Sequence, residues 1–474
     1  MAHQLETRLF IGGKWLESDD RLPVMNPYTG EEIARVSSAD SAHLEQAVTA
    51  AETSGMSSLT GAQRYELLSS AAGAIERESV ELARLIVAET GKPLRYSAGE
   101  VERAFQTFSF AADEARRLHG ETLELDAHPG GKGYFGFYHR FPLGVIAAIS
   151  PFNFPLNLVA HKVAPALAAG NSVILKPSSE TPLVALRLAQ ILEDAGAPPG
   201  AVNVLMGSGS TVGQALVTHP RVKMVTFTGS LEVGEMIRRN AGMKKVTLEL
   251  GSNSAVVIED EAKLEEAVER CVVGAFAFSG QVCISIQRIL LNERLAERFL
   301  KIFLPRVEAI TRGDPLEETT EIGPMITGEE ARRIEKWVSS ALKQGAGVLT
   351  GGKREGAFYR PTVLDRVQPA MDVYSKEAFA PIVCVETYSD YQQALARVNN
   401  SRYGLQAGVF TESMEKAMMA FSRLEVGGVV INDFPTFRVD QMPYGGVKGS
   451  GTGREGPHFA VEEMSEVKLC CMRL

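Results

Sequence analysis

The stretch Gly144-Val145-Ile146-Ala147-Ala148-Ile149-Ser150 is an uninterrupted run of small and apolar residues, and two similar runs follow it at residues 172–176 and 202–205. Segments of helical character separate these runs, at residues 160–170 and 182–195. Buried strands that alternate with helices form a mostly parallel sheet covered on both faces. The stretch therefore predicts an α/β fold, in which ligands bind at the carboxyl ends of the strands.

The same kind of alternation continues on the C-terminal side. A second α/β unit is expected to begin after Gly251 with the apolar run 255–258 and to extend to about Asp440. The segment Gly133-Tyr134-Phe135-Gly136-Phe137-Tyr138 alternates like an exposed hairpin, and residues 467–471 form a plausible strand. An exposed apolar hairpin needs a partner edge, so we expect an oligomer.

Composition restricts the class of protein. A chain of 474 residues is too long for one ordinary core, which predicts two or three domains. The formal net charge of -9 argues against a nucleic-acid or anionic-membrane surface, and no apolar run is long enough to cross a membrane. Five cysteines without disulfide-like spacing indicate reduced thiols in the cytoplasm. The expected partner is a small molecule.

Cys283 is the candidate reaction centre. It lies just after Gly280 and Gln281 in the nearly uncharged segment 276–288. A thiolate is the strongest nucleophile among side chains, and a Gly-Gln turn can direct backbone N–H groups at the sulfur and at an oxyanion beside it. An inert core cysteine has the same local pattern, so this segment alone leaves both interpretations open.

Two further residues could supply the other functions of such a site. Glu249 is a carboxylate among apolar residues at the end of a strand, where desolvation would raise its pKa toward that of a general base. The alternative is an exposed charge on an edge strand. Asn153 lies between Pro151 and Pro155, where it is either a turn residue or a fixed donor to an oxyanion.

Two glycine-rich turns could bind a dinucleotide. The turn at residues 207–213, which includes Gly209 and Gly213, follows a strand but lacks the strict Rossmann spacing. The segment 227–230 also follows a strand and opens a helix, whose amide groups could hold a pyrophosphate, and we favour it. Lys176 ends another strand and is either solvated or beside a ribose.

Together these motifs resemble the aldehyde dehydrogenase superfamily over essentially the whole chain. The motifs that carry the resemblance are Pro151-Phe152-Asn153-Phe154-Pro155, Lys176-Pro177-Ser178, Phe227-Thr228-Gly229-Ser230, Leu248-Glu249-Leu250-Gly251, the segment 276–283, Glu377-Ala378-Phe379 and Pro443-Tyr444-Gly445-Gly446-Val447-Lys448. Two departures, Ser252 and Ala380 in place of the usual glycines, affect only loop geometry.

The resemblance implies a three-part subunit and a homodimer or homotetramer. Its parts are an NAD(P)-binding domain at residues 1–121 and 141–250, a catalytic domain at residues 251–440, and an oligomerisation flap at residues 122–140 and 456–474. It also implies that Cys283 attacks an aldehyde, that Asn153 and the Cys283 amide hold the oxyanion, and that Glu249 activates the water that hydrolyses the thioester. We expect no metal ion.

The resemblance places the cofactor, NAD or NADP, along the carboxyl ends of the strands. Lys176 would contact the adenine ribose, Ser230 the pyrophosphate, and Glu377 with Phe379 the nicotinamide ribose. Relatives that prefer NAD often carry a carboxylate where this chain has Ser179, so NADP should be accepted. The full set of expected cofactor contacts is Ser150, Pro151, Phe152, Lys176, Ser178, Ser179, Gly209, Gly213, Phe227, Gly229, Ser230, Leu250, Gly251, Glu377 and Phe379.

The substrate is less constrained. Segments 283–287 and 430–443 are similar to the branch of lactaldehyde and non-phosphorylating glyceraldehyde-3-phosphate dehydrogenases. Arg103, His161 and Arg438 fall where some relatives bind an anionic group, whereas Val282 replaces an arginine typical of relatives that select dianions. We therefore expect a short hydroxylated or anionic aldehyde, and the candidates are lactaldehyde, glycolaldehyde, succinic semialdehyde, sulfolactaldehyde and glyceraldehyde 3-phosphate.

Two other classes remain open at this point. An aldehyde dehydrogenase that passes its thioester to coenzyme A would normally lack the base, so Glu249 argues against that class. A structural protein on the same fold would be expected to have lost the nucleophile or the base.

Overall fold

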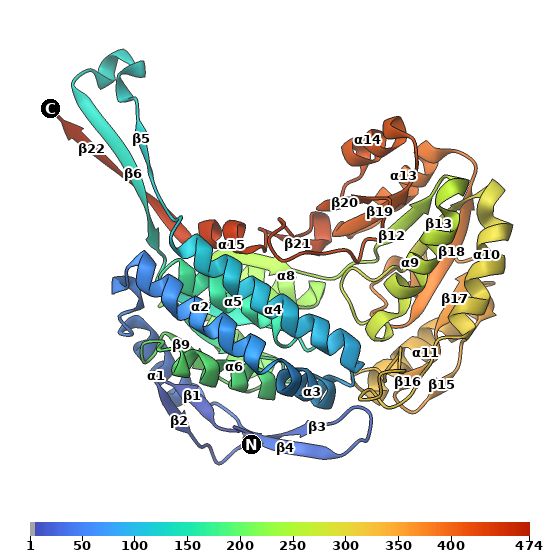
Figure 1. Ribbon diagram of the computed structural model, residues 1–474, viewed down its shortest axis with the longest axis horizontal. Coiled ribbons are helices and arrows are strands. Elements are labelled where there is room, and N and C mark those ends of the chain that lie inside the picture. The colour runs from blue at the N-terminus through green and yellow to red at the C-terminus, as the bar shows by residue number, and fades with distance from the viewer. Residues whose placement is uncertain (1–4) are drawn as a thin grey trace.

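The structure, a computed structural model, describes residues 5–474 and is drawn in Figure 1. Two sheets of mainly parallel strands, each with helices packed on it, form two units, and a three-stranded ribbon projects from the first unit (Figure 1). The prediction of an α/β fold with two parallel sheets and a small β flap is confirmed.

The first unit is built on an eight-stranded sheet. Its strands, in spatial order, are β2 (Lys14–Leu16), β1 (Leu9–Ile11), β9 (Val202–Val204), β8 (Ser172–Lys176), β7 (Val145–Ile149), β10 (Val222–Thr228), β11 (Lys245–Glu249) and β21 (Gly451–Thr452). The strands from β9 to β11 are mutually parallel, while β1 and β21 pair antiparallel with them. The chain runs outward from β7 to β9 and then resumes on the other side with β10. The strand order thus reverses between β7 and β10, where α/β sheets bind ligands.

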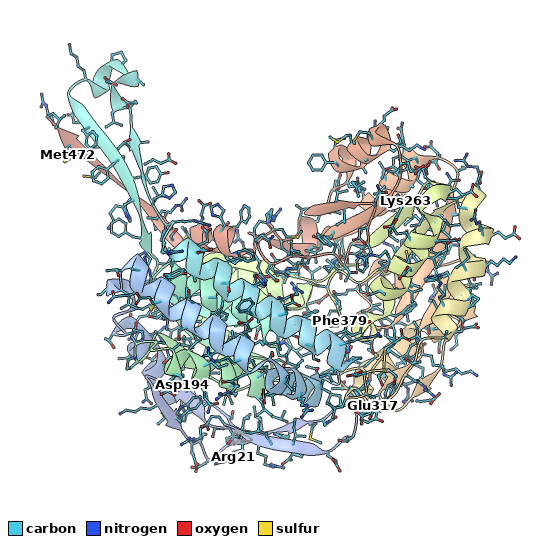
Figure 2. The ribbon with its side chains drawn as sticks, in the orientation of Figure 1. Arg21, Asp194, Lys263, Glu317, Phe379 and Met472 are labelled. Atoms are coloured by element: carbon cyan, nitrogen blue, oxygen red, sulfur yellow. The ribbon has the colours of Figure 1, made fainter. Side chains whose placement is uncertain are left out.

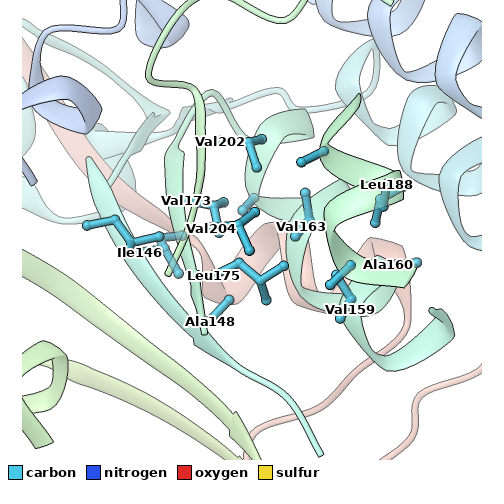
Figure 3. Packing of buried hydrophobic residues seen from close by; sticks show 14 of the residues in the cluster. Ile146, Ala148, Val159, Ala160, Val163, Val173, Leu175, Leu188, Val202 and Val204 are labelled. Carbon is cyan, nitrogen blue, oxygen red and sulfur yellow. The ribbon is translucent and has the colours of Figure 1, made fainter. Parts of the chain in front are cut away.

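Two apolar helices pack directly on this sheet. They are α5 (Asn157–Ala168) and α6 (Leu183–Asp194), and Figure 3 shows their side chains against those of β7, β8 and β9. The predicted segments 160–170 and 182–195 are therefore helical, with slightly different ends. Outside them lie α2 (Gly61–Arg77), α3 (Ser79–Thr90) and α4 (Leu94–Ala115) (Figure 1). Because α5 is covered on both sides, all of its residues are buried, including His161 and Lys162.

The remaining elements of the first unit lie around this core. They are the hairpin of β3 (Arg21–Met25) and β4 (Glu32–Ser37) and the helices α1 (Ser41–Glu52), α7 (Gln214–Thr218) and α8 (Leu231–Asn240). Ser230 caps α8, since its side chain accepts a hydrogen bond from the amide of Val233. The helix therefore begins directly at the carboxyl end of β10.

The second unit contains a seven-stranded sheet. Its strands, in spatial order, are β14 (Gly347–Thr350), β17 (Thr362–Asp365), β18 (Ile382–Tyr388), β13 (Arg288–Asn292), β12 (Ala255–Ile258), β19 (Gln406–Phe410) and β20 (Gly428–Ile431). Val256 and Ile258 pack with α9 (Leu264–Phe276) and α10 (Glu293–Glu308), whereas Val257 packs with α13 (Tyr391–Asn399). The alternation of strand side chains explains why both faces of this sheet are covered. Further helices of this unit are α11 (Gly328–Lys343), α12 (Asp372–Ser375) and α14 (Met414–Arg423).

The flap consists of β5 (Glu121–Leu123), β6 (Tyr134–Pro142) and β22 (Ser465–Arg473). β22 pairs antiparallel with β6 over its whole length, from Ser465 opposite Pro142 to Arg473 opposite Tyr134. The flap projects away from the first unit and carries the C-terminus (Figure 1). The stretch 133–138, expected to be a hairpin by itself, instead belongs to the single strand β6, which lies between β5 and the predicted C-terminal strand in one sheet.

The last part of the chain differs from the expected division. Residues 457–463, expected in the flap, form α15 (Pro457–Glu463), which packs on α4 and α5 because it buries Pro457, Ala460 and Val461. Just before it, β21 joins the edge of the first sheet. Residues 441–456 therefore return from the second unit to the first. Within residues 5–474, no helix is long and apolar enough to cross a membrane.

Candidate active site

The loop that carries Cys283 is held in an unusual backbone conformation. Phe278, Ser279 and Gly280 all have positive φ angles, of 49°, 55° and 67°. A Cβ atom at Gly280 would lie 2.2 Å from the carbonyl oxygen of Ala380, so no other residue fits there. Ser279 donates a hydrogen bond of 2.6 Å to the carbonyl of Gly323, which helps to maintain the strained turn. The turn sets Cys283 at the wall of a cleft.

Asn153 is tied to the same loop. Its side chain is buried, and its Nδ2 donates a hydrogen bond of 3.0 Å to the carbonyl of Gln281. Its Oδ1 is also buried and has no hydrogen-bond partner in the described part of the chain. The second hydrogen of the amide remains available beside Cys283, as an oxyanion donor requires.

A buried ion pair contacts both the turn that carries Asn153 and the loop that carries Cys283. Lys92 and Glu100 pair with each other at zero side-chain exposure, and Glu100 also accepts hydrogen bonds from the amides of Leu156 and Asn157, where α5 begins. The Lys92 ammonium lies over the ring of Phe154, at 3.9 Å, and over the ring of Phe278, at 4.6 Å. One buried cation thus connects the Asn153 turn to the Cys283 loop.

Glu249 is buried at the end of β11. The strand is not an exposed edge, because β10 and β21 flank it. Both carboxylate oxygens are buried and have no hydrogen-bond partner among residues 5–474. Burial, and then the nearby charge of Glu455, raise the pKa of Glu249 well above its ordinary value. A carboxyl group in this state accepts a proton more readily than an exposed one, as a general base must.

Glu455 is a buried carboxylate with the opposite behaviour. It accepts hydrogen bonds from Lys162, at 2.9 Å, and from Arg438, at 3.0 Å. Burial acts to raise the pKa of Glu455, but the charges of Lys162 and Arg438 outweigh it and lower that pKa. Two neighbouring carboxyl groups therefore differ, since Glu455 is ionised and Glu249 is held closer to its protonated form.

Cys283 is close to this charged cluster. Its sulfur lies 3.0 Å from the hydroxyl of Tyr444, and the Arg438 guanidinium stacks on the Tyr444 ring at 3.7 Å. Burial raises the pKa of the Cys283 thiol to about 11, while the hydrogen bond with Tyr444 and the charge of Arg438 act to lower it. The thiol is thus mainly protonated at neutral pH and depends on its neighbours for activation.

A cleft of about 510 Å3 opens between the two units, at the carboxyl ends of β10 and β11. Phe379 lies at this junction and packs edge to face against Phe152, with ring centroids 5.8 Å apart (Figure 2). The expected cofactor residues that line the cleft are Pro151, Phe152, Gly229, Ser230, Leu250, Gly251, Glu377 and Phe379. Cys283, Glu249 and Asn153 line the same cleft.

Other expected cofactor residues lie outside the cleft. Ser150 follows β7 with a buried hydroxyl that is unpartnered in the described residues, and Phe227 lies one residue before the lining residue Thr228. Lys176 ends β8 and lies beside Gly213, at 3.6 Å from a Cβ placed there. Ser178 bonds to Glu180, Ser179 donates to the carbonyl of Gly207, and Gly209 begins a single π-helical turn. Ser150 and Phe227 thus lie at the carboxyl ends of β7 and β10, and the other residues lie at or after those of β8 and β9.

The fit to a dinucleotide rests on particular observations. Gly229 and Ser230 join β10 to the N-terminus of α8, which favours a pyrophosphate. A Cβ at Gly251 would lie 2.3 Å from Oε2 of Glu377, so only glycine allows Glu377 to occupy this position. Burial raises the pKa of Glu377 to about 7, and the amide of Ser252 donates a hydrogen bond of 3.0 Å to it. The residues present fit an NAD(P) molecule.

The three expected substrate residues are all paired within the protein. Arg103 donates two hydrogen bonds to Asp440, of 2.9 and 3.2 Å, and His161 lies 2.9 Å from the same carboxylate. Burial acts to raise the pKa of Asp440, but His161 and Arg103 lower it below its usual range. Arg438 pairs with Glu455 and is only 5% exposed. The three residues therefore belong to one buried charged network, which does not line the 510 Å3 cleft.

Sequence reasoning missed several members of this network. Tyr444 was part of a quoted motif but received no role, and Glu455, Lys162 and Asp440 were not identified. Lys162 carried a usable signal, since a lysine inside the apolar helix α5 must find a buried partner. Arg288 has a structural role, since it is buried, does not line the cleft, and donates to the carbonyls of Asn253, Arg397 and Val398.

Comparison with known proteins gives the class of this protein. The sequence profile of the aldehyde dehydrogenase family matches residues 15–470. The chain belongs to this family, and its class of activity is the NAD(P)-dependent oxidation of aldehydes. It is 44% identical to the 3-sulfolactaldehyde dehydrogenase of Priestia aryabhattai, over 98% of both chains.

Two solved structures are similar over nearly the whole chain. Aldehyde dehydrogenase 21 from Physcomitrella patens, in complex with the reaction product succinate, is 40% identical and superposes with a TM-score of 0.97 over 98% of both chains. A glyceraldehyde-3-phosphate dehydrogenase from Methanocaldococcus jannaschii, complexed with NADP, is 38% identical with a TM-score of 0.92, over 96% of this chain and 100% of that one. The expected family and branch are confirmed.

Proposed function

We propose that this protein oxidises a short aldehyde with one anionic group to the carboxylic acid, with NADP or NAD as the oxidant. Succinic semialdehyde and sulfolactaldehyde are substrates of this kind, and lactaldehyde and glycolaldehyde are uncharged analogues. The observation that carries the proposal is the largely buried charged network behind the cleft, which reaches Cys283 through Arg438 and Tyr444. The proposal agrees with the relatives, one of which is named for sulfolactaldehyde and another of which binds succinate.

The chemistry follows from the groups in the cleft. The Cys283 thiolate attacks the aldehyde carbon, and the resulting oxyanion accepts hydrogen bonds from the Asn153 amide and the Cys283 N–H. NAD(P), whose nicotinamide ribose Glu377 and Phe379 would hold, would supply the hydride acceptor, and Cys283 would then carry the acyl group as a thioester. Glu249 then removes a proton from water, the hydroxide attacks the thioester carbonyl, and the thiolate leaves with release of the acid. The unpartnered carboxylate of Glu249 is free to receive that water.

The charge balance of the network favours a monoanion. Arg103, Arg438 and Lys162 supply three positive charges, and Asp440 and Glu455 supply two negative charges. Burial lowers the pKa of His161, so His161 is counted as neutral, and Glu249 is left out of the sum because it gains and loses a proton during the proposed reaction. One uncompensated positive charge remains, and Nε of Arg438 is buried without a partner in the described part of the chain. A single carboxylate or sulfonate would neutralise the site, because buried charges need partners.

A dianionic substrate fits this balance less well. A phosphate would bring a second negative charge into a site with one surplus cation. Position 282, directly before the nucleophile, is Val282 and adds no cation. Glyceraldehyde 3-phosphate is therefore a weaker candidate than the monoanionic aldehydes.

The residue near the adenine ribose permits NADP. The part-buried Ser179 hydroxyl donates a hydrogen bond of 3.2 Å to the carbonyl of Gly207. In the sequence, Ser179 follows Lys176 by three positions. An uncharged residue does not repel a 2′-phosphate, and the Lys176 ammonium bonds only to the carbonyl of Pro177 among the described residues. Both cofactors can be held, and NADP gains the attraction of Lys176.

The flap is proposed to join subunits. Its strands expose a set of large apolar side chains, namely Leu123, Tyr134, Phe135, Phe141, Val467, Leu469 and Met472. Helix α14 of the second unit exposes Met414, Met418 and Phe421, of which Met414 is 75% exposed. Apolar surface of this extent on a projecting ribbon needs a partner. A second copy of the chain supplies one, in a homodimer or homotetramer.

The function is tested by a panel of aldehydes with both cofactors. We expect formation of NADPH and of NADH, with the highest kcat/KM for succinic semialdehyde or sulfolactaldehyde and lower values for lactaldehyde and glyceraldehyde 3-phosphate. Addition of coenzyme A should leave the free acid as the product. A hundredfold preference for NAD would refute the interpretation of Ser179, and a lack of cofactor reduction with every aldehyde would refute the function.

The proposed role of Arg103 in binding the anionic group of the substrate is tested by Arg103→Met. Arg103 is 29% exposed, so its loss should disturb packing less than the loss of the buried Arg438. We expect kcat/KM for succinic semialdehyde to fall about tenfold or more, since a charge-assisted contact is lost, and that for lactaldehyde to change less than about threefold. The matched control is Arg95→Met, on the same helix and 42% exposed, which should leave both values unchanged. An equal loss of kcat/KM for both aldehydes would contradict the proposal that Arg103 binds the anionic group.

The oligomer is tested by placing lysines on the flap. Val467 and Leu469 are 47% and 53% exposed on the same face of β22. We expect native protein to have a mass of two or four times 51.3 kDa by light scattering after gel filtration, and Val467→Lys with Leu469→Lys to shift it toward 51.3 kDa. Val80→Lys, at a 58% exposed position of α3, is the control and should not change the mass. A monomeric native protein would contradict the proposal.

A further inference from the structure

Tyr444 is held firmly at the reaction centre by its own backbone and by its neighbours. Its N–H donates to the carbonyl of Glu455, at 3.0 Å, and its carbonyl accepts from the Glu455 N–H, at 2.7 Å. The side chain is 2% exposed and packs with Ile284 and Leu405. The Arg438 guanidinium covers the ring at 3.7 Å. The ring therefore has little freedom to move away from Cys283.

The hydroxyl of Tyr444 makes one polar contact among the described residues, with the sulfur of Cys283 at 3.0 Å. While the thiol is protonated, either group can donate. Once the thiol has lost its proton, only the phenol can donate. Burial, together with the nearby charge of Cys283, raises the pKa of Tyr444 well above its ordinary value, so the phenol keeps its hydrogen.

We propose that Tyr444 is a further catalytic residue, whose hydroxyl donates a hydrogen bond to the Cys283 sulfur and stabilises the thiolate before the aldehyde binds. The contact also fixes the direction of the sulfur at the wall of the cleft. The inference rests on the proposed function to the extent that Cys283 is taken as the nucleophile. Tyr444 thereby gains a role of its own, which its place in the motif and beside Arg438 does not by itself give it.

The surroundings of Cys283 make this contact important. Burial disfavours the thiolate, and the carboxylates of Glu377 and Glu249, from the segment after α12 and from β11, disfavour it further. Tyr444 and Arg438 act in the other direction. Arg438 is already paired with Glu455, at 3.0 Å, which reduces the charge that it offers the sulfur. The Tyr444 hydroxyl is therefore a direct and uncompensated source of stabilisation for the thiolate.

The test is the pH dependence of alkylation in Tyr444→Phe, which removes the hydroxyl and keeps the ring under Arg438. Iodoacetamide reacts with the thiolate, so that an S–C bond forms as iodide leaves, and the rate reports the thiolate fraction. Without aldehyde or cofactor, we expect the rate at pH 8 to fall about tenfold and the rate profile to move about one unit to higher pH.

Two controls make the measurement specific. Cys470 and Cys471 are half-buried and exposed, so the Cys283 peptide must be followed by mass spectrometry rather than total labelling. The matched variant is Tyr359→Phe, because Tyr359 is also buried and its hydroxyl has no partner within residues 5–474. Tyr359→Phe should keep the native profile.

A Tyr444→Phe profile that coincides with the native one overturns the proposal. If that variant does not fold, 3-fluorotyrosine at position 444 retains the ring and has a more acidic hydroxyl, so the profile should move to lower pH, and an unchanged profile again overturns the proposal. The alkylation needs no substrate. A shifted profile in a protein that oxidises no aldehyde would therefore support Tyr444 while refuting the proposed function, and the reverse result would refute Tyr444 alone.

Discussion

The hydrogen bonds of Ser450 hold the two units together at the point where the chemistry is placed. Its carbonyl accepts from the N–H of Leu250 at 2.9 Å, and its hydroxyl donates to the carbonyl of Gly251 at 2.7 Å and accepts from the N–H of Gly404. Through these contacts the returning segment 441–456 is fixed against the end of β11. Glu249 owes its proximity to Tyr444 and Glu455 to this return, because β11 and the returning segment are distant in the sequence. The same contacts between the two units also shape the cleft.

The junction of the two units at Ser450 creates a buried site in which charge is distributed unevenly. Glu455 is ionised because Lys162 and Arg438 bond to it, whereas Glu249 is buried without a hydrogen bond in the described structure. Two carboxyl groups in different surroundings can therefore have different functions, one as a permanent charge and one as a proton acceptor. In the function that we propose, the surplus cation in the same network favours a monoanionic substrate. Substrate choice and catalysis thus depend on one set of buried contacts.

Most of the fold could be predicted from the sequence because the strands are buried on both faces. Residues 144–150, 172–176 and 255–258 are continuous apolar runs, and each forms a parallel strand. Helix α15 was not separated from the flap, because its seven residues are too short to show a helical period. Its place against α4 and α5 is a property of tertiary packing.

Part of the candidate site could also be predicted, because some of its residues have an unusual local sequence context. Cys283, Glu249 and Asn153 each carry an unusual local context, and all three line one cleft. The pairing of Arg103 with Asp440 spans 337 positions of the chain, and no local pattern indicates it. Glu455 lies in a polar segment that resembles an exposed loop. Sequence could therefore identify candidate groups that line the cleft but not the buried partners that set their charge.

The account is tested most directly by the fate of the acyl group in Glu249→Gln, mixed with the preferred aldehyde and cofactor and analysed by intact-protein and peptide mass spectrometry. We predict one equivalent of reduced cofactor, very slow further turnover, and an acyl group attached to Cys283. Native turnover in this variant, or an adduct on any residue other than Cys283, would contradict the account.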